Sequence, residues 1–307
     1  MRTLVTGAAG FIGSHLTEEL RSRGDGVVAV DSFTDYYDPH RKRENARDLV
    51  LDFDLETDDL ESVIGGVDRV FHLAGQPGVR ASFGSGFELY VRRNVLATAR
   101  LFEVAAHSGV RVAYASSSSI YGDAEAYPTP EEAQPRPISP YGITKLSCEH
   151  LAYAYAKAEG LDAVGLRYFT VYGPRQRPDM AFTRMLEALA EGSVFRVYGD
   201  GSASRSFTYV DDAVSGTIAA IEHGKTGAIY NIGGGEEASM NEVFALVRDI
   251  SGRALRIEHV ESAAGDVRRT SADCTRASQD LGWEASTPLA EGLAKHWSWV
   301  ADRVGVH

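Results

Sequence analysis

The heptapeptide GAAGFIG, from Gly7 to Gly13, decides the fold of this 307-residue chain. It follows a β-rich run at residues 3–6 and precedes a stretch with helical spacing at residues 15–23. Glycines between a strand and a helix allow a tight turn and let a pyrophosphate approach the free N–H groups at the helix N-terminus. The pattern GxxGxxG is a variant of GxGxxG, and it predicts a dinucleotide site. A plain structural turn is the alternative for the three glycines.

Strand-like and helix-like stretches alternate from this point to about residue 170. Further β-rich runs lie at residues 27–30, 69–73, 111–115 and 163–166, and helical spacing is found at residues 94–107 and 141–159. Such alternation is typical of a parallel sheet that carries helices on both faces. We therefore expect an α/β fold with a Rossmann-type doubly wound parallel sheet. Its ligands should bind outside the carboxyl ends of the strands.

The alternation weakens after Tyr172. Residues 173–178 are rich in Pro, Gly and charge, and helical spacing returns at residues 179–191, 240–250, 273–281 and 289–300. We expect a smaller mixed α/β C-terminal domain that binds the substrate. The expected cofactor domain is 1–171, with 206–235 returning to it. The expected substrate domain is 172–205 together with 236–307.

Composition limits the function. The chain has 31 Lys and Arg against 43 Asp and Glu, a formal net charge of −12, which disfavours binding to nucleic acid. Its two cysteines, Cys148 and Cys274, are too few for a disulfide framework or a four-cysteine zinc site. We expect a reducing, cytoplasmic location and no metal. We also expect no signal peptide and no membrane span, because long apolar runs are lacking.

An acid closes the second expected strand. Asp31 stands 18 positions after Gly13, close to the spacing of about 20 that is typical of dinucleotide sites. A carboxylate there can accept hydrogen bonds from both hydroxyls of an adenosine ribose and would repel a 2′-phosphate, which favours NAD over NADP. Asp54 follows a third expected strand, where it could meet the adenine amino group. A helix N-cap is the alternative for Asp54.

Tyr141 and Lys145 lie four positions apart, on one face of an expected helix. A phenol with its usual pKa of about 10 is a poor base at neutral pH, but a nearby ammonium group favours the phenolate. The pair alone has low specificity. The polar loop Ser116–Ser119, at the end of the fifth expected strand, supports a catalytic role for the pair, and Tyr141 follows Ser119 by 22 positions. We therefore expect Tyr141 to accept a proton from a sugar hydroxyl.

Six motifs carry a family resemblance. In chain order they are TGAAGFIG, HLAG, SSSSIYG, YGITK, RYFTVYGP and RSFTYVDD. This set resembles the extended short-chain dehydrogenase/reductase superfamily, and more narrowly its nucleotide-sugar epimerases and dehydratases, over essentially the full chain. The resemblance implies a tightly held NAD, a catalytic triad and a C-terminal lobe for UDP- or dTDP-sugars. In this triad Ser117 forms a hydrogen bond with the reacting 4-hydroxyl, Tyr141 is the base, and Lys145 binds the nicotinamide ribose.

The expected cofactor contacts follow from these patterns and from the resemblance. They are Gly7, Gly10, Phe11, Ile12, Gly13, Asp31, Asp54, Leu55, Leu73, Ala74, Gly75, Asn94, Tyr141, Lys145 and Tyr168. The small residues after the fourth expected strand would let a flat cofactor pass, although tight helix–sheet packing uses the same residues.

The serine loop separates reaction classes within the family. Sugar 4,6-dehydratases of the superfamily carry Asp-Glu at the positions of Ser118 and Ser119, and related UDP-glucuronate decarboxylases usually carry Glu at the position of Ser119. Hydroxyl groups cannot supply that acid. The resemblance therefore favours 4-epimerisation, which needs only reversible oxidation at C4.

Three segments are similar to UDP-glucuronate 4-epimerases in particular: Asp35–Asp38 (DYYD), Gln76–Arg80 (QPGVR) and Arg177–Met180 (RPDM). A C6 carboxylate would need charged or multiply donating partners. The candidates are Arg177, Thr170, Ser118 and Ser119, with Arg80 as second choice. A surface salt bridge is the alternative for Arg177.

The chain departs from those epimerases at Gln76-Pro77 and at Arg175-Gln176, where they usually show Gln-Ala and Trp-Gly. UDP-glucose or UDP-N-acetylglucosamine 4-epimerisation is therefore the alternative, with UDP-glucuronate decarboxylation less favoured. By resemblance, Arg205 and Arg268 contact the UDP diphosphate. A homodimer formed through the helices at 94–107 and 141–159 is also implied.

Overall fold

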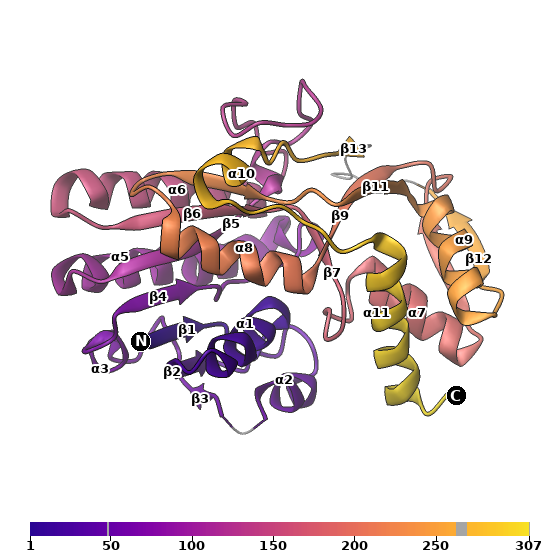
Figure 1. Ribbon diagram of the computed structural model, residues 1–307, viewed down its shortest axis with the longest axis horizontal. Helices are drawn as coiled ribbons and strands as arrows, with labels where there is room; N and C mark the ends of the chain where they lie inside the picture. The colour runs from indigo at the N-terminus through magenta and orange to yellow at the C-terminus, as the bar shows by residue number, and fades with distance from the viewer. Residues whose placement is uncertain (48, 262–268, 307) are drawn as a thin grey trace.

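Two lobes of unequal size make up the protein (Figure 1). The computed structural model describes residues 1–47, 49–261 and 269–306. The larger lobe holds a seven-stranded sheet, and the smaller lobe holds short strands with α7, α9 and α11 around them.

All pairings in the large sheet are parallel, and its strand order is β10-β6-β5-β4-β1-β2-β3. The strands are β1 (Arg2–Thr6), β2 (Gly26–Asp31), β3 (Leu51–Asp52), β4 (Arg69–His72), β5 (Arg111–Ser117), β6 (Ala163–Tyr168) and β10 (Ile229–Ile232). The order reverses between β1 and β4, so connections leave these strands in opposite directions and open a crevice at their carboxyl ends. The predicted doubly wound sheet is confirmed.

Helices cover both faces of this sheet. One face carries α1 (Phe11–Ser22) and α8 (Val210–His223), and the other carries α3 (Leu60–Ile64), α5 (Ala97–Ser108) and α6 (Pro140–Glu159). Each face has its own hydrophobic cluster, because successive strand residues point to opposite sides. Val5 and Phe71 belong to the first cluster, whereas Leu4 and Val70 belong to the second.

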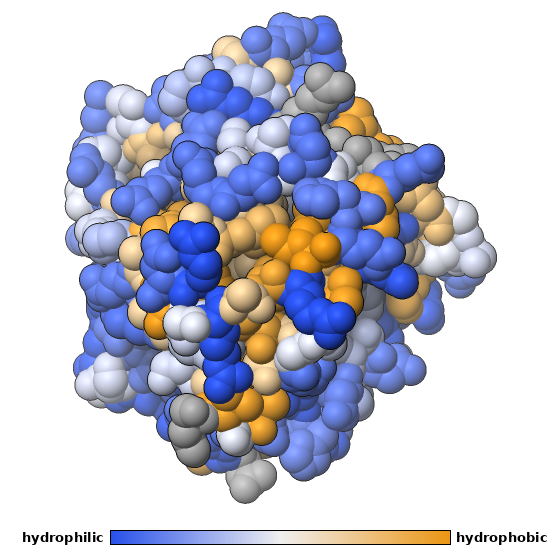
Figure 2. All heavy atoms as spheres, turned by 90° about the vertical axis from the view of Figure 1, so that its right-hand side faces the viewer, coloured by the Kyte–Doolittle hydropathy of each residue, from blue (hydrophilic) through white to orange (hydrophobic). Residues whose placement is uncertain are grey.

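The smaller lobe is built around two short sheets. One contains β7 (Thr170–Tyr172), β9 (Ser204–Tyr209), β11 (Glu236–Ser239) and β13 (Arg269–Thr270), and the other pairs β8 (Val194–Tyr198) with β12 (Arg256–Val260). The helices of the C-terminal part are α7 (Ala181–Glu191), α9 (Met240–Ser251), α10 (Thr275–Leu281) and α11 (Leu289–Val304). In the view of Figure 2, which faces the α9 side, apolar side chains gather near the middle and hydrophilic residues surround them.

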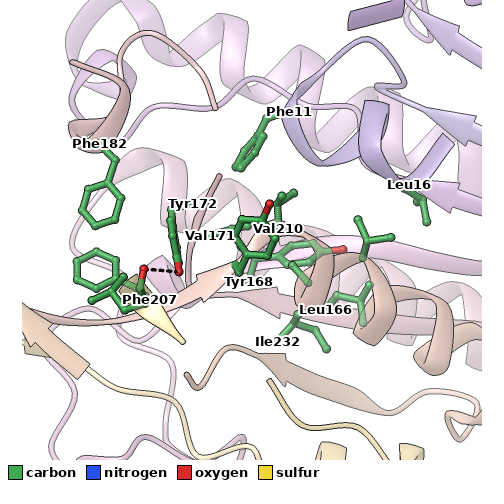
Figure 3. Close-up of a cluster of buried hydrophobic side chains, with 14 of the residues drawn as sticks. Phe11, Leu16, Leu166, Tyr168, Val171, Tyr172, Phe182, Phe207, Val210 and Ile232 are labelled. Atoms are coloured by element: carbon green, nitrogen blue, oxygen red, sulfur yellow. Dashed lines mark hydrogen bonds between the residues drawn. The ribbon is translucent and has the colours of Figure 1, made fainter. Parts of the chain in front are cut away.

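A continuous core joins the lobes. Figure 3 shows Leu166 and Ile232 of the large sheet, Tyr168 and Val171 near the junction, and Phe207 of the smaller lobe in one cluster of buried side chains. The ring of Phe207 packs against Phe182 with centroids 4.6 Å apart. The two lobes therefore share hydrophobic packing rather than a polar linker.

Short elements between the main ones position loops of the site. They are α2 (Pro39–Ala46), α4 (Phe87–Tyr90), the 3-10 turns η1 (Arg80–Ser82), η2 (Gly84–Gly86) and η4 (Ser118–Ile120), and the π-helical turn η3 (Val91–Leu96). None of the helices within the described ranges is long and apolar enough to cross a membrane.

Two helix boundaries differ from the expected ones for identifiable reasons. The stretch 94–107 is not one α-helix, because the π-helical turn η3 precedes α5 and directs the Asn94 amide to the backbone of Gln76. The helix expected from residue 179 begins only at Ala181, because the Asp179 carboxylate pairs with Arg177 and Met180 is extended. In both places a side-chain contact outside the helix competes with regular helical structure.

Candidate active site

A cavity of about 370 Å³ lies at the carboxyl ends of the central strands. Residues at or just after the ends of β1, β2, β3 and β4 line it, together with the last residues of β5 and residues of α6 and of the segment after β7. The predicted site residues among them are Gly7, Gly10, Phe11, Ile12, Gly13, Asp31, Asp54, Leu55, Leu73, Ala74, Gly75, Ser117, Tyr141, Lys145, Tyr168 and Arg177. One cavity thus brings together most of the predicted cofactor residues, the three predicted catalytic residues and Arg177.

The glycine loop fits a dinucleotide for steric reasons. Gly7 has a φ of +70°, and a Cβ atom there would lie 2.7 Å from the backbone N of Ala74. A Cβ atom at Gly13 would overlap the carbonyl oxygen of Gly7. The loop and the first turn of α1 can therefore pack this closely only without side chains, and the helix N-terminus faces the cavity for an anionic group.

Asp31 is the last residue of β2, and backbone N–H groups hold its carboxylate in place. Its Oδ2 accepts a hydrogen bond from Ala9 N (3.2 Å) and its Oδ1 accepts one from Phe33 N (2.9 Å). The buried Lys42 ammonium lies 3.6 Å from Oδ1 and donates to Thr34 Oγ1. The carboxylate is therefore held at the cavity wall, where ribose hydroxyls can donate to its remaining lone pairs.

Replacing Asp31 with alanine is expected to weaken NAD binding by roughly tenfold to a hundredfold, the scale of hydrogen bonds to a charged group. The preference for NAD over NADP should also fall, because Lys42 then faces a 2′-phosphate without the carboxylate. Calorimetric titration of the cofactor-free protein with both dinucleotides measures the change. Asp52→Ala, on the exposed edge strand β3, is the control. An unchanged NAD affinity in Asp31→Ala would contradict the assignment.

Two other cofactor predictions are refined by the structure. Asp54 lines the cavity and its Oδ1 accepts a hydrogen bond from Glu56 N, whereas Asp59 is the N-cap of α3. Asp54 therefore caps the turn at residues 55–58 but is not the N-cap of α3. Asn94 stands behind the cavity wall and holds it: its Oδ1 accepts from Gln76 N at 2.6 Å, and its Nδ2 donates to Gln76 O and Thr144 Oγ1.

The start of α6 presents the catalytic pair. Ser139 caps the helix by accepting from Gly142 N. Tyr141 follows in the first turn, with its ring 6.3 Å from that of Tyr90. Lys145 donates to the carbonyl oxygen of Ala115 at 2.9 Å, which ties the ammonium group to β5.

Ser117 ends β5 and faces the same space. Its hydroxyl oxygen accepts a hydrogen bond from Ser119 N at 3.1 Å, so the turn η4 fixes its position. The strand end and the helix start thus place a hydroxyl, a phenol and an ammonium group around one cavity.

The predicted substrate residues are not all in this cavity. Of the described residues, Arg80, Ser118, Ser119, Thr170 and Arg205 lie outside its lining. The Arg80 guanidinium stacks on the Tyr198 ring at 4.1 Å and so joins the two lobes, and Arg205 lies on β9. Arg268 lies outside the described residues.

Sequence reasoning missed several cavity residues. Lys42, Tyr36, Tyr37, Arg93 and Met180 line the cavity beside the predicted ones. The DYYD motif and the basic run after it indicate this segment as part of the site. The sequence alone does not tell that Lys42, among the charged residues 41–44, is the buried one.

The loop that carries Arg177 is anchored to the cofactor helix. His15 on α1 donates through Nε2 to the carbonyl oxygen of Pro174 (2.9 Å), and Arg175 pairs with Glu18 of the same helix at 2.6 Å. Burial, with the charge of Arg175, lowers the pKa of His15 to about 4. The imidazole is therefore neutral at physiological pH, and the contact does not depend on its charge.

The arrangement of these residues defines the class of protein. A parallel sheet with a glycine loop at its crevice, an acid at the end of β2 and a Tyr–Lys pair beside both is a dinucleotide-dependent enzyme site. Within the described part of the chain, no group of three or more His, Cys, Asp and Glu residues is arranged to hold a metal ion.

Comparison with known proteins agrees with this class. The NAD dependent epimerase/dehydratase family matches residues 3–233. The chain is 41% identical to "Uncharacterized UDP-glucose epimerase YtcB" of Bacillus subtilis (strain 168), covering 98% of both chains. It is 35% identical to a UDP-glucuronate 4-epimerase of Thermodesulfobacterium geofontis (strain OPF15), covering 98% of this chain and 96% of the other.

A solved structure extends the likeness to three dimensions. The UDP-glucuronic acid 4-epimerase of Bacillus cereus, in complex with UDP-glucuronic acid and NAD, superposes with a TM-score of 0.95 at 39% identity and covers 99% of this chain and 100% of that one. The chain belongs to the NAD dependent epimerase/dehydratase family. The predicted family and the predicted cofactor, NAD, are confirmed.

Proposed function

We propose that the protein is a UDP-hexuronic acid 4-epimerase that interconverts UDP-glucuronate and UDP-galacturonate. The observation that carries the proposal is the convergence of Ser117, Tyr141, Lys145 and Arg177 on the cavity that also contains the glycine loop. The first three supply proton transfer at C4, and Arg177 supplies a cation for a C6 carboxylate. Two of the three relatives compared above carry the name of this activity.

The chain's own residues provide the acid–base chemistry. Ser117 forms a hydrogen bond with the sugar 4-hydroxyl, and Tyr141 accepts the proton of that hydroxyl. Lys145, fixed by Ala115 O, holds the nicotinamide ribose beside the reacting hydroxyl. The glycine loop and Asp31 would hold NAD, which would supply a reversible hydride acceptor at C4, and the 4-keto sugar would turn over in the pocket so that its opposite face is reduced. Tyr141 then returns the proton, so the reaction has no net redox change.

The keto acid formed from a glucuronate tends to lose CO₂, and the pocket must prevent this. Loss requires the bond to the carboxylate to align with the ketone π system. A guanidinium that binds both carboxylate oxygens can hold this bond out of alignment. We assign this clamp to Arg177, the member of the predicted carboxylate-binding set that lines the cavity.

Arg177→Ala is expected to lower kcat/KM for UDP-glucuronate by roughly 10- to 100-fold, the scale of a lost hydrogen-bonded charge partner, and to raise the share of product that has lost CO₂. NMR of the sugar products with CO₂ detection measures both. Arg196→Ala, which removes an exposed cation of β8 paired with Glu258, is the control. Unaltered epimerisation and CO₂ release in Arg177→Ala would contradict the clamp.

A second candidate, 4-epimerisation of UDP-glucose or UDP-N-acetylglucosamine, is favoured by one contact. Arg177 is already paired with Asp179, with Nε–Oδ1 and Nη2–Oδ2 both at 3.0 Å. A paired cation needs no substrate carboxylate to balance its charge. The name of the Bacillus subtilis relative points to the same substrate class.

The first experiment is incubation of the purified protein with UDP-glucuronate, without added NAD, followed by NMR of the sugars. UDP-galacturonate without a pentose supports the main proposal. A UDP-pentose points to decarboxylation and contradicts it. If UDP-glucose is converted and UDP-glucuronate is not, even with NAD added, the second candidate is correct.

The proposal includes the expected organisation of the molecule. Residues 1–171 and 206–235 form the NAD domain, whereas 172–205 and 236–307 bind the nucleotide sugar, with Arg205 and Arg268 at its diphosphate and Arg80 as second choice for its C6 carboxylate. The enzyme is cytoplasmic and forms a homodimer through α5 and α6. Exposed apolar side chains on or beside these helices, such as Leu96, Ile143 and Tyr153, support that interface.

A further inference from the structure

Asp179 links the active-site cation Arg177 to the loop after β2. It lies two residues after Arg177 and engages that guanidinium through both carboxylate oxygens. It also accepts a hydrogen bond from the hydroxyl of Tyr36 at 3.2 Å. Arg177 and Tyr36 line the cavity, and the Arg177 guanidinium lies 6.0 Å from the Tyr36 ring centroid. The three side chains form one group, named here the Tyr36–Asp179–Arg177 cluster.

Two segments far apart in the sequence build this cluster, and a third packs against it. Tyr36 belongs to the loop after β2, and the other two residues belong to the segment between β7 and α7. The Tyr36 hydroxyl also packs against Gly78, in the loop after β4, where a Cβ atom would overlap it. Because Arg177 and Tyr36 hold Asp179 from two sides, its carboxylate has a fixed position directly behind two side chains that line the cavity.

The cluster carries opposite charges at close range. Burial opposes ionisation of Asp179, but the hydrogen bond and the charge of Arg177 outweigh it and lower the pKa of this carboxyl below its usual value. Asp179 is therefore anionic at neutral pH. Arg177 and Asp179 are 22% and 38% exposed, so solvent screens the pair only in part.

We propose that Asp179 determines the preference for the C6 substituent of the sugar: it balances the charge of Arg177 and thereby lets the pocket accept a neutral hydroxymethyl group as well as a carboxylate. A substrate carboxylate near Arg177 is attracted by the guanidinium and repelled by Asp179, whereas a hydroxymethyl group experiences neither effect strongly. The proposal rests on the proposed function, because it takes the C6 end of the sugar to face Arg177.

Binding to the NAD-loaded protein tests this without turnover. In a Tyr141→Phe background, calorimetry gives Kd for UDP-glucuronate and for UDP-glucose, and the ratio of the two is the readout. Asp179→Asn keeps the shape and an acceptor oxygen but removes the charge. The ratio should shift towards UDP-glucuronate by about tenfold, the scale of one charge a few ångströms away in a partly solvated site.

Two variants separate charge at this site from other effects. Asp179→Glu keeps the charge and should leave the ratio near that of the parent. Glu187→Gln removes one negative charge from α7, where Glu187 pairs with Arg41, and should not shift it. An unchanged or opposite shift in Asp179→Asn, or an equal shift in Glu187→Gln, overturns the proposal.

The binding experiment distinguishes failure of this proposal from failure of the proposed function. If the unsubstituted enzyme fails to convert UDP-glucuronate, the main functional proposal fails, but the binding ratio still measures the role of Asp179. If UDP-glucuronate binds the parent too weakly to measure, Asp179→Asn must bring its binding into range. Failure to do so overturns the role of Asp179.

Discussion

Tyr141→Phe is expected to reduce the rate of epimerisation by about 10²- to 10⁴-fold, the usual contribution of a positioned general base. The variant loses the phenolic oxygen but keeps the ring, which packs against Tyr90. Cofactor and substrate should therefore still bind. The loss should appear in kcat, with little change in KM, because proton transfer belongs to the transition state and not to the bound ground state.

NMR-monitored turnover and the NAD content of the purified variant measure these effects. Tyr153→Phe is the matched control, because Tyr153 lies on the same helix but is 66% exposed. Normal turnover in Tyr141→Phe would contradict the assignment of the base, whereas loss of bound NAD would show that the phenol also holds the cofactor.

Glu149→Ala is expected to give the largest loss of stability, on the order of 3–5 kcal/mol of unfolding free energy, because it leaves a buried guanidinium without its counter-charge. Arg167 on β6 pairs with Glu149 on α6 through Nε–Oε1 (3.0 Å) and Nη2–Oε2 (2.8 Å), and both side chains are 5% exposed. Arg167 also donates to Tyr121 Oη and to Glu131 O.

The same change should slow catalysis, because Ser116 donates to Glu149 and directly precedes Ser117. Denaturant unfolding of the NAD-loaded protein measures the stability change. Glu159→Ala, at the exposed end of α6 near His107, should change it by less than about 0.5 kcal/mol. A loss below about 1 kcal/mol in Glu149→Ala would show that water enters and solvates Arg167.

Local patterns predicted the large sheet and the parts of the site that follow its strands. The glycine loop, Asp31 and the Tyr141–Lys145 pair each have a signature within a few residues, because strand ends, tight turns and one helix face fix their positions. Parallel strands then bring these signatures to one edge of the sheet. This is why a reading along the chain could anticipate a three-dimensional site.

Contacts between distant loops could not be predicted in this way. Tyr36 and Asp179 are 143 positions apart, and nothing in either segment indicates the other. The sequence offered a substrate carboxylate or a surface salt bridge as alternatives for Arg177. The structure shows that an ion pair and a cavity position coexist, because the partner Asp179 is itself bound to a cavity-lining tyrosine.

The path of the chain between the two lobes constrains how such enzymes can diversify. The chain leaves the large sheet at β7, returns through α8 to place β10 beside β6, and leaves again at β11. A chimaera with a single junction near residue 170 would exchange β10 along with the sugar-binding parts and put a foreign strand against β6. Recombination that changes the sugar preference and keeps the dinucleotide crevice must therefore replace two separate segments at once. One precedes α8 and the other follows β10.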